Sequence, residues 1–212
     1  MSHESNDCVP PPPELNFTLP TDREVLSTPI YGLDTYEIQS RLPIDVLLVT
    51  VTDHEFNGCF SYMRDIKRCA VDQEMVYFGE LRSRNIMVAL IVLGIFPDTY
   101  NAIKLAGVLN PKVVLFVGTC ATLNSTDLKL GDVIISTKLV DFTCKENVNM
   151  SRNMSRLIHT ATDNWQPPFK DVSCCEVKVH PHAVMLSCER ERQQQLLQQF
   201  PDALCCTIPG RG

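Results

Sequence analysis

The sequence predicts an α/β layered fold, in which strands and helices alternate along the chain. Residues 44–52 are mainly leucine and β-branched side chains, the pattern of a strand that is buried on both faces. The segment between Pro97 and Asn110 carries helix punctuation at both ends, because Pro-Asp opens it and Asn-Pro follows it. The segments around these two continue the alternation, which favours helices layered on a sheet.

The other elements follow from local patterns, taken in chain order. Asp53 can cap a helix in which Phe56, Phe60 and Met63 recur at spacings of four and three. Two apolar runs flank Arg-Ser-Arg-Asn and predict a hairpin. Beyond residue 110 the pattern predicts strands at 112–118 and 132–138, a helix at 153–165, a strand at 183–188, a helix at 189–200 and a strand from 202.

Length and composition indicate one domain with a tail. The chain has 212 residues, of which 44% are hydrophobic, and this suits a single domain with a sizeable core. Residues 1–43 include the run Cys-Val-Pro-Pro-Pro-Pro, which favours extended backbone over a packed element. We therefore expect a disordered proline-rich tail or linker over residues 1–43 and the domain over residues 44–212.

Charge and cysteine content exclude several classes of partner. The net charge of -6 offers no basic face for nucleic acid. No apolar run reaches the ~18 residues of a membrane span, and the N-terminus lacks the pattern of a secretory signal. The ten cysteines are therefore expected to be reduced thiols in a cytoplasmic protein. They form no CxxC pair, and His180 and His182 are interpreted as loop histidines, so neither a metal nor a cofactor is expected.

A candidate ligand site lies where the apolar strand at 112–118 ends. Gly118 would let a ligand approach the backbone closely, and ligands of α/β sheets bind beyond the carboxyl ends of strands. Thr119 offers a hydroxyl and the neighbouring amides are donors. A tight strand exit without a ligand explains the same residues. Cys120 has no histidine partner in the sequence, which favours a small core thiol over a nucleophile.

These segments resemble a known enzyme superfamily, that of the purine nucleoside phosphorylases and methylthioadenosine/S-adenosylhomocysteine nucleosidases. The family carries an apolar strand ending in G-S-x-G-G-L, a short loop and then L-x-x-G-D-V/I. The counterparts here run from Gly118 to Leu123 and from Leu130 to Val133, and the resemblance covers roughly residues 44–204. It implies a three-layer fold with a mixed central sheet that is incomplete at the C-terminus. It also implies cleavage of the N-glycosidic bond of a purine nucleoside, no cofactor, and homo-oligomers.

The resemblance also implies roles for individual residues. Glu55 matches the glutamate that orients water in the nucleosidase branch, although a first-turn glutamate also stabilises a helix by itself. Gly118 and Thr119 match the contacts to ribose or to the nucleophile, and Cys120 lies in the same substrate-binding segment. Gly94 matches the glycine before the next helix, where an ordinary turn is the alternative.

Two departures from the family pattern bear on the reaction. Phe116 stands where bacterial phosphorylases have a phosphate-binding arginine, and the early G-x-P-x-R segment is missing, so hydrolysis is favoured over phosphorolysis. Thr207 stands where the family's ribose-binding acidic triplet would begin, and the late Ser/Asp pair has no counterpart. This predicts an uncovered apolar sheet edge and leaves activity in question. The alternative function is a non-catalytic nucleoside-sensing or assembly module.

Overall fold

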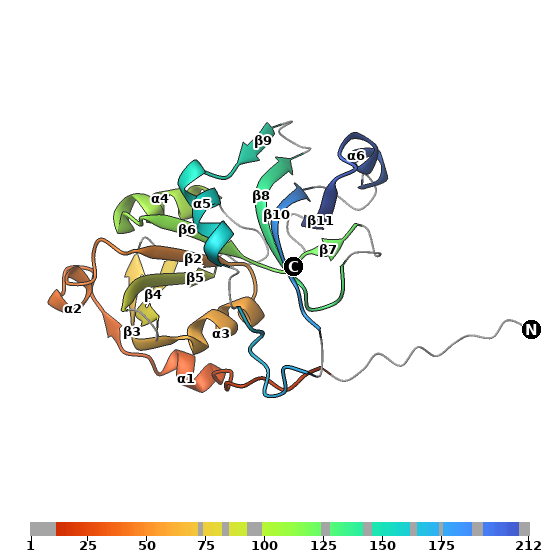
Figure 1. Cartoon of the computed structure of the whole chain (residues 1–212). Coiled ribbons are helices and arrows are strands. Elements are labelled where there is room, and N and C mark those ends of the chain that lie inside the picture. The colour runs from red at the N-terminus through yellow and green to blue at the C-terminus, as the bar shows by residue number, and fades with distance from the viewer. Residues whose placement is uncertain are drawn as a thin grey trace, which may run out of the picture.

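Two mixed sheets, of six and five strands, form the framework of the protein (Figure 1). The structure is a computed structural model that describes residues 12–71, 74–81, 85–92, 99–123, 128–141, 146–161, 165–173, 176–187 and 193–207. The strand orders are β1-β3-β4-β5-β2-β6 and β7-β11-β10-β8-β9. The predicted α/β class is therefore confirmed, with the described strands divided between two sheets.

The six-stranded sheet combines an antiparallel meander with a parallel half. Its strands are β1 (Ile30–Tyr31), β2 (Val46–Thr50), β3 (Met63–Val71), β4 (Glu74–Leu81), β5 (Ile86–Val92) and β6 (Val113–Val117). Strands β3, β4 and β5 are antiparallel neighbours, which confirms the predicted hairpin, whereas β2 lies between β5 and β6 and is parallel to both. The carboxyl ends of these three parallel strands therefore meet at one edge of the sheet.

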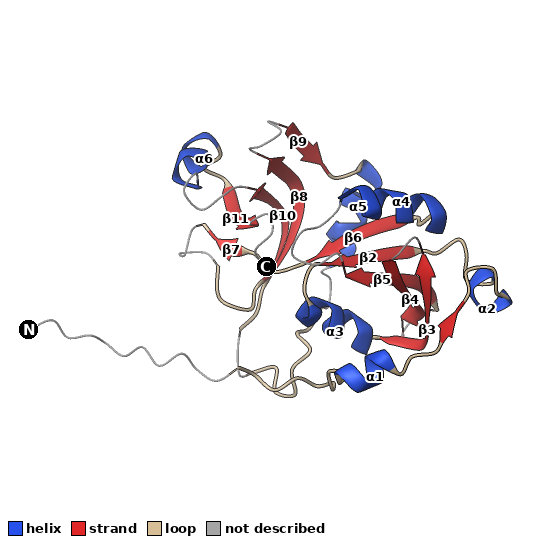
Figure 2. Ribbon diagram, turned by 180° about the vertical axis from the view of Figure 1, so that it is seen from behind, coloured by secondary structure: helices blue, strands red, loops and turns tan. Residues whose placement is uncertain are grey.

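Helices cover both faces of this sheet, which gives the predicted three layers (Figure 2). The helices are α1 (Asp22–Leu26), α2 (Tyr36–Gln39), α3 (Asp53–Ser61) and α4 (Thr99–Leu109). On one face, Leu105 and Leu109 of α4 pack with Phe78 of β4 in the larger core cluster. On the other face, Phe56 of α3 packs against Leu90 of β5. Each such fully buried side chain stabilises the fold by roughly 1.5–3 kcal/mol.

The five-stranded sheet has a smaller core. Its elements are β7 (Ala121–Thr122), β8 (Val133–Asp141), β9 (Glu146–Asn149), α5 (Arg152–Ala161), β10 (Val179–Ser187), α6 (Gln193–Gln199) and β11 (Ala203–Thr207). Strands β8, β10 and β11 are parallel neighbours, and they bury Val140, Leu186 and Cys206 with the ring of Phe200 partly covering them. None of the described helices is both long and apolar enough to cross a membrane.

The predicted disordered tail over residues 1–43 is wrong for its second half. Strand β1 pairs with β3, with Ile30 opposite Arg68, and the side chain of Ile38 is 0% exposed in the larger core cluster. Leu33 and Leu42 pack against the same cluster. The apolar side chains after residue 27 are too widely spaced to give a periodic pattern. They nevertheless pack against the larger core cluster. Residues 1–11 lie outside the described part of the chain.

The predicted helix from Asp53 is shorter than its pattern suggested. Helix α3 ends at Ser61, its N-cap is Thr52, and β3 begins at Met63. Met63 is nonetheless 2% exposed, because β3 starts beside the buried face of α3 and Met63 joins the same core cluster as Phe56. The spacing of three residues between Phe60 and Met63 therefore predicted the burial of Met63 correctly, but it predicted a helix where the structure has a strand.

Strand β6 is an edge strand and is not buried on both faces. Within the described residues it pairs only with β2, and Val114, Leu115 and Phe116 are 40%, 38% and 72% exposed. The apolar composition of β6 alone would favour a strand that is covered on both faces. The uncovered edge that the sequence predicted was beside the C-terminal strand, and β6 is a different edge.

Replacing Gly131 by alanine is expected to destabilise the protein by about 1–2 kcal/mol. Gly131 has φ +96°, a conformation that L-residues rarely adopt, while a Cβ there would meet Val177 only in ordinary contact at 3.6 Å. Urea unfolding measures the change. Gly58→Ala in α3 is the matched control, because a Cβ at Gly58 meets no atom within 4 Å and a helical alanine should stabilise instead. Equal effects of the two substitutions would contradict the backbone explanation.

Candidate functional site

Two of the predicted site segments leave the same edge of the six-stranded sheet. Glu55 follows β2, and Gly118 follows β6. Thr50 at the end of β2 faces Val92 at the end of β5 and Val117 at the end of β6. The topology therefore brings the Glu55 and Gly118 segments to the carboxyl edge at which α/β sheets bind ligands. Gly94, the third predicted site residue that comes after a strand, follows β5 in the sequence and lies outside the described residues.

Glu55 has a defined structural role at the start of α3. The side chain is half-buried, and its carboxylate accepts hydrogen bonds from the backbone N–H of Thr52 at 2.7 Å and from the Thr52 hydroxyl at 2.5 Å. This is the acidic half of a capping box, the helix-stabilising role that the sequence left open as an alternative. Burial, followed by the nearby Glu55 carboxylate, raises the pKa of Cys59 to about 11.

The segment from Gly118 to Cys120 borders open space. All three residues are exposed, and a Cβ at Gly118 would meet no heavy atom of the other described residues within 4 Å. Core packing therefore does not fill the position beside the main chain where a ligand was predicted to approach. The interpretation of Cys120 as a small core thiol is wrong, because the residue is exposed.

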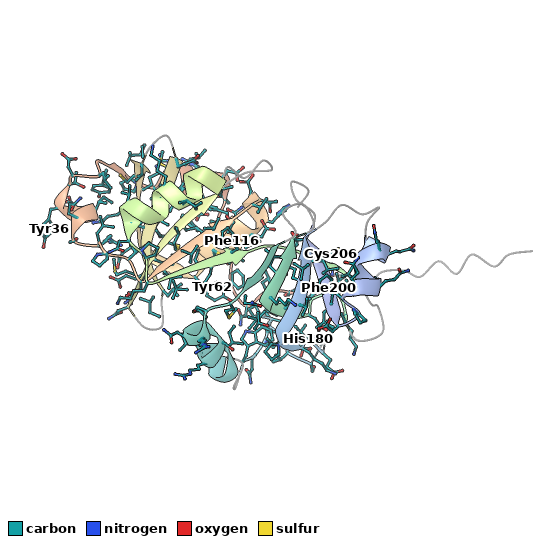
Figure 3. The ribbon with its side chains drawn as sticks, turned by 90° about the horizontal axis from the view of Figure 1, so that it is seen from above. Tyr36, Tyr62, Phe116, His180, Phe200 and Cys206 are labelled. Carbon is teal, nitrogen blue, oxygen red and sulfur yellow. The ribbon has the colours of Figure 1, made fainter. Side chains whose placement is uncertain are left out.

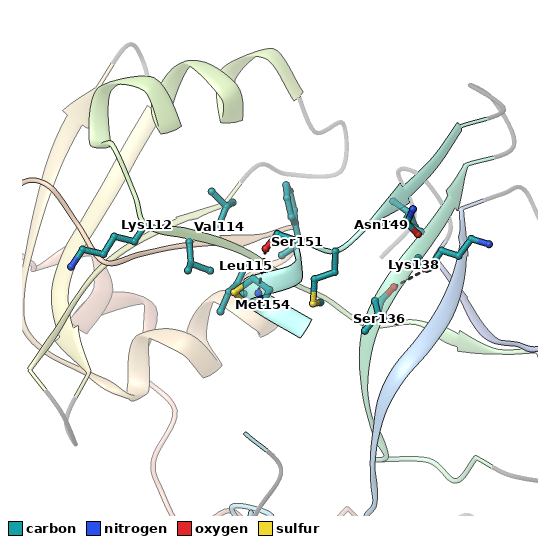
Figure 4. Close-up of a pocket in the computed structure, with 13 residues that line it drawn as sticks. Lys112, Val114, Leu115, Ser136, Lys138, Asn149, Ser151 and Met154 are labelled. Atoms are coloured by element: carbon teal, nitrogen blue, oxygen red, sulfur yellow. Dashed lines mark hydrogen bonds between the residues drawn. The ribbon is translucent and has the colours of Figure 1, made fainter. Parts of the chain in front are cut away.

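Two hollows in the described part of the protein lie away from this edge. One, of about 420 Å³, lies between β6 and the β8, β9 and α5 region and includes Val114, Lys138 and Met154 (Figure 4). The other, of about 380 Å³, includes Thr18 and Arg64. Neither hollow is lined by Glu55 or by Gly118 to Cys120. The candidate site is therefore an open strand edge in the described residues.

The Gly131-Asp132 pair of the family motif has a structural function. Asp132 has a side chain that is 3% exposed, and it accepts hydrogen bonds from the N–H groups of Lys129 at 3.0 Å and Lys178 at 2.9 Å. The His180 ring lies 2.9 Å from the same carboxylate. His180 was predicted in a loop, but it belongs to β10, where this contact ties the strand to the start of β8 (Figure 3).

Sequence reasoning did not identify the neighbour of Cys120. That neighbour is Cys205 on β11, whose thiol lowers the pKa of Cys120. Two cysteines so far apart in the chain show no recognisable spacing, and only the pairing of β7 with β11 brings them together. The candidate edge therefore carries a pair of thiols beside the exposed glycine and threonine.

Solved structures share this fold across most of the chain. A methylthioadenosine/S-adenosylhomocysteine nucleosidase from Colwellia psychrerythraea 34H, solved in complex with adenine, is 12% identical, with a TM-score of 0.62 over 77% of this chain and 72% of that chain. The nucleosidase from S. pneumoniae, solved with the transition-state inhibitor MT-ImmA, is 13% identical, with a TM-score of 0.60 over 79% and 76%. A futalosine hydrolase mutant from Helicobacter pylori strain 26695 is 14% identical, with a TM-score of 0.58 over 79% and 80%.

Sequence comparison assigns the family. A search of curated protein sequences finds no significant match. The family model described as the phosphorylase superfamily matches residues 65–183, which is more than half of the chain. The matched range contains Gly118 and Asp132 and begins after Glu55. The chain belongs to the phosphorylase superfamily.

Proposed function

We propose that this protein binds a purine nucleoside at the carboxyl edge of β2 and β6 and hydrolyses its N-glycosidic bond. The observation that carries the proposal is the unobstructed main chain at Gly118, one strand away from Glu55. The names of the structural neighbours support it, since two are nucleosidases solved with adenine or a transition-state inhibitor and a third is a futalosine hydrolase. Thr119 and the neighbouring amides would hold the ribose, because they are the exposed donors beside the open position.

The proposed reaction uses Glu55 as a general base. The carboxylate accepts one proton from water while the water oxygen bonds to the anomeric carbon. The bond from that carbon to the purine nitrogen breaks, and its electron pair leaves with the base, which takes up a proton from solvent while Glu55 returns its proton to solvent. Glu55 keeps its place during this step because Thr52 holds one carboxylate oxygen, Oε2, leaving the other for water.

Hydrolysis is favoured over phosphorolysis by the side chains of β6. Phe116, two residues before Gly118, is apolar and 72% exposed, so it provides no cation for a phosphate (Figure 3). Lys112, just before the strand, pairs with Asp45 at 2.7 Å, at the opposite end from Gly118. Water as the nucleophile requires no such cationic donor.

A second candidate function is nucleoside binding without cleavage. The observation that favours it is the engagement of Glu55 with Thr52, because a carboxylate used as a helix cap explains the residue without catalysis. Such a module would bind the same ligands and release no base.

The two functions are separated by one set of measurements on the full chain. The protein is incubated with methylthioadenosine, S-adenosylhomocysteine, inosine and adenosine, with and without phosphate, and free base is measured by chromatography. Release that does not depend on phosphate supports hydrolysis. Calorimetric binding without release supports the second candidate. If none of the four nucleosides is bound and none releases a free base, both candidate functions are overturned.

Replacing Gly118 by valine is expected to weaken nucleoside binding about tenfold, or 1.4 kcal/mol, without destabilising the fold. The new side chain occupies the open position beside the backbone, and Gly118 does not have a left-handed φ that would strain a valine. Calorimetry and urea unfolding measure the two effects. Gly107→Val is the control, because Gly107 also borders open space but lies on α4. Unchanged affinity in Gly118→Val would exclude ligand contact at this position.

A further inference from the structure

Strand β7 lies beside β11 in the second sheet (Figure 1), and the register of this pair places Cys120 and Cys205 on the same side of the sheet. In this antiparallel ladder Ala121 faces Cys206 and Thr122 faces Cys205. Continued by one residue, the register sets Cys120 opposite Thr207. Side chains alternate between faces along a strand, so Cys120, Thr207 and Cys205 share one face and Cys206 points to the other. The effect of the Cys205 thiol on the pKa of Cys120 agrees with this placement.

The two thiols differ in exposure and in acidity. Cys120 is exposed, whereas Cys205 is 0% exposed. The hydrogen bond from Cys205 outweighs partial burial and lowers the pKa of Cys120 to about 7. The same hydrogen bond, then burial and the charges of Cys120 and Cys206, raise the pKa of Cys205. The pair therefore combines an accessible thiol of lowered pKa with a buried thiol of raised pKa, which is the arrangement of an attacking and a resolving cysteine.

We propose that Cys120 and Cys205 are a peroxide-sensitive dithiol that closes to a disulfide between the Gly118 segment and β11. In the first step the Cys120 thiolate attacks hydrogen peroxide, the O–O bond breaks, and Cys120 sulfenic acid and hydroxide form. In the second step the Cys205 sulfur displaces the sulfenic oxygen, and with the Cys205 proton this oxygen leaves as water. Two electrons pass from the two sulfurs to one peroxide molecule.

Closing the disulfide requires Cys120 to move toward Cys205, because diagonal neighbours across a ladder lie about 7–8 Å apart. Sulfur atoms must come within about 2.05 Å, and the Cα atoms within about 7 Å. Cys120 immediately precedes β7 and lies outside its ladder, so the chain can move there without breaking a strand pair. The neighbouring Gly118 has open space beside it, which leaves room for this adjustment.

Other described thiols are poor competitors for peroxide. Burial and the Glu55 carboxylate raise the pKa of Cys59 to about 11, and burial and Asp34 raise that of Cys69. Both remain protonated at neutral pH, and the thiolate is the reactive form. The first oxidation is therefore expected at Cys120 among the described cysteines.

The disulfide would tie down the backbone on which the proposed ribose contacts lie. Thr119 precedes Cys120 directly, so a link to β11 fixes the position of its hydroxyl. This effect on nucleoside binding rests on the proposed function, whereas the thiol chemistry stands without it.

Peptide mapping of the full-length protein tests the link. Reduced protein is treated with hydrogen peroxide, the remaining thiols are blocked with iodoacetamide, and the protein is digested with trypsin. Cleavage after Lys112 and Lys129 releases Cys120 in peptide 113–129, and cleavage after Arg192 and Arg211 releases Cys205 and Cys206 together in peptide 193–211. We expect these two peptides to be joined in the wild type.

Two single variants identify the partner within peptide 193–211. The joined peptides should persist in Cys206→Ala and disappear in Cys205→Ala, which makes Cys206→Ala the matched control. Fragmentation of the wild-type joined peptide separates position 205 from 206 without any variant, should either variant fail to fold. A loop between Cys205 and Cys206, a link from Cys120 to any other cysteine, or no link at all would overturn the proposal.

Discussion

Replacing Glu55 by glutamine should lower the rate of nucleoside hydrolysis by about 10²–10⁴-fold and leave the stability of the protein unchanged. A glutamine cannot accept the proton of the attacking water at neutral pH. Its amide oxygen can still accept the hydrogen bonds that the Thr52 N–H and hydroxyl donate, because glutamine serves as well as glutamate in a capping box. Rates of base release and urea unfolding measure the two quantities on the same preparation.

The chain contains a natural control for this substitution. Glu24 accepts a hydrogen bond from the Thr21 N–H at 2.7 Å and another from the Thr21 hydroxyl at 2.9 Å, so α1 has the same capping box as α3. Glu24→Gln should therefore leave both the rate and the stability unchanged. Glu55→Ala should lose the cap as well as the base, with a further cost of about 1 kcal/mol in stability.

The two roles of Glu55 give different patterns across these variants. If Glu55 were only a cap, Glu55→Gln would hydrolyse at the wild-type rate and Glu55→Ala would change stability alone. If the protein binds nucleosides without cleaving them, calorimetry would show equal affinities for Glu55→Gln and the wild type. A lower rate in Glu24→Gln would show that helix capping in general, and not this carboxylate, controls activity.

The elements that the sequence predicted best are those with strong local patterns. The run at 44–52 contains β2, and the segment between Pro97 and Asn110 contains α4, because continuous apolar residues and helix punctuation depend only on near neighbours. Strand β3 was missed because its exposed and buried positions do not alternate regularly, and its pairing with β4 shifts register between Arg64 and Lys67.

The position of a strand within the sheet was beyond local pattern. β2 and β6 are both short apolar runs, yet β2 is central and β6 is at the edge, with Phe116 72% exposed. The number of neighbours that a strand has depends on where the other strands lie. The residues of the strand itself do not determine it. The same holds for Ile38, whose burial depends on a core assembled from distant segments.

The candidate site was predictable only in part, because some of its features are local in the sequence and others depend on distant strands. A glycine at a strand end and a glutamate after another strand are visible in the sequence, and parallel neighbours bring them to one edge. The contact of Cys120 with Cys205 was not predictable, because it requires the pairing of β7 with β11. The position of Gly94 stays a prediction, because it lies outside the described residues.

Replacing Asp132 by asparagine should destabilise the protein by about 2–4 kcal/mol at neutral pH. The carboxylate accepts from the N–H groups of Lys129 and Lys178 and contacts His180, and all three contacts hold the start of β8 against β10. An asparagine amide has one oxygen, so its NH₂ group must face one of these donors and leave that N–H without its acceptor. Urea unfolding measures the loss.

The loss should depend on pH in a defined direction. Burial raises the pKa of Asp132, but the hydrogen bonds from Lys178, Lys129 and His180 outweigh it, so the pKa lies below its ordinary value. A carboxyl with a lowered folded-state pKa stabilises the fold above the unfolded-state pKa of about 3.9, and this stabilisation is lost as the pH falls further. The difference in unfolding free energy between the wild type and Asp132→Asn should therefore shrink as the pH falls below about 4.

Asp171 provides the control that separates burial from hydrogen bonding. Its carboxylate accepts from the Ser173 N–H at 2.9 Å and from the Ser173 hydroxyl at 2.6 Å, but the residue is exposed. Water replaces those bonds in Asp171→Asn, so the stability of that variant should match the wild type within the error of the measurement. A comparable loss in the two variants would mean that burial of Asp132 is not the cause. If the difference in unfolding free energy for Asp132→Asn stayed constant down to pH 2, the charge of Asp132 would not be the cause of the loss.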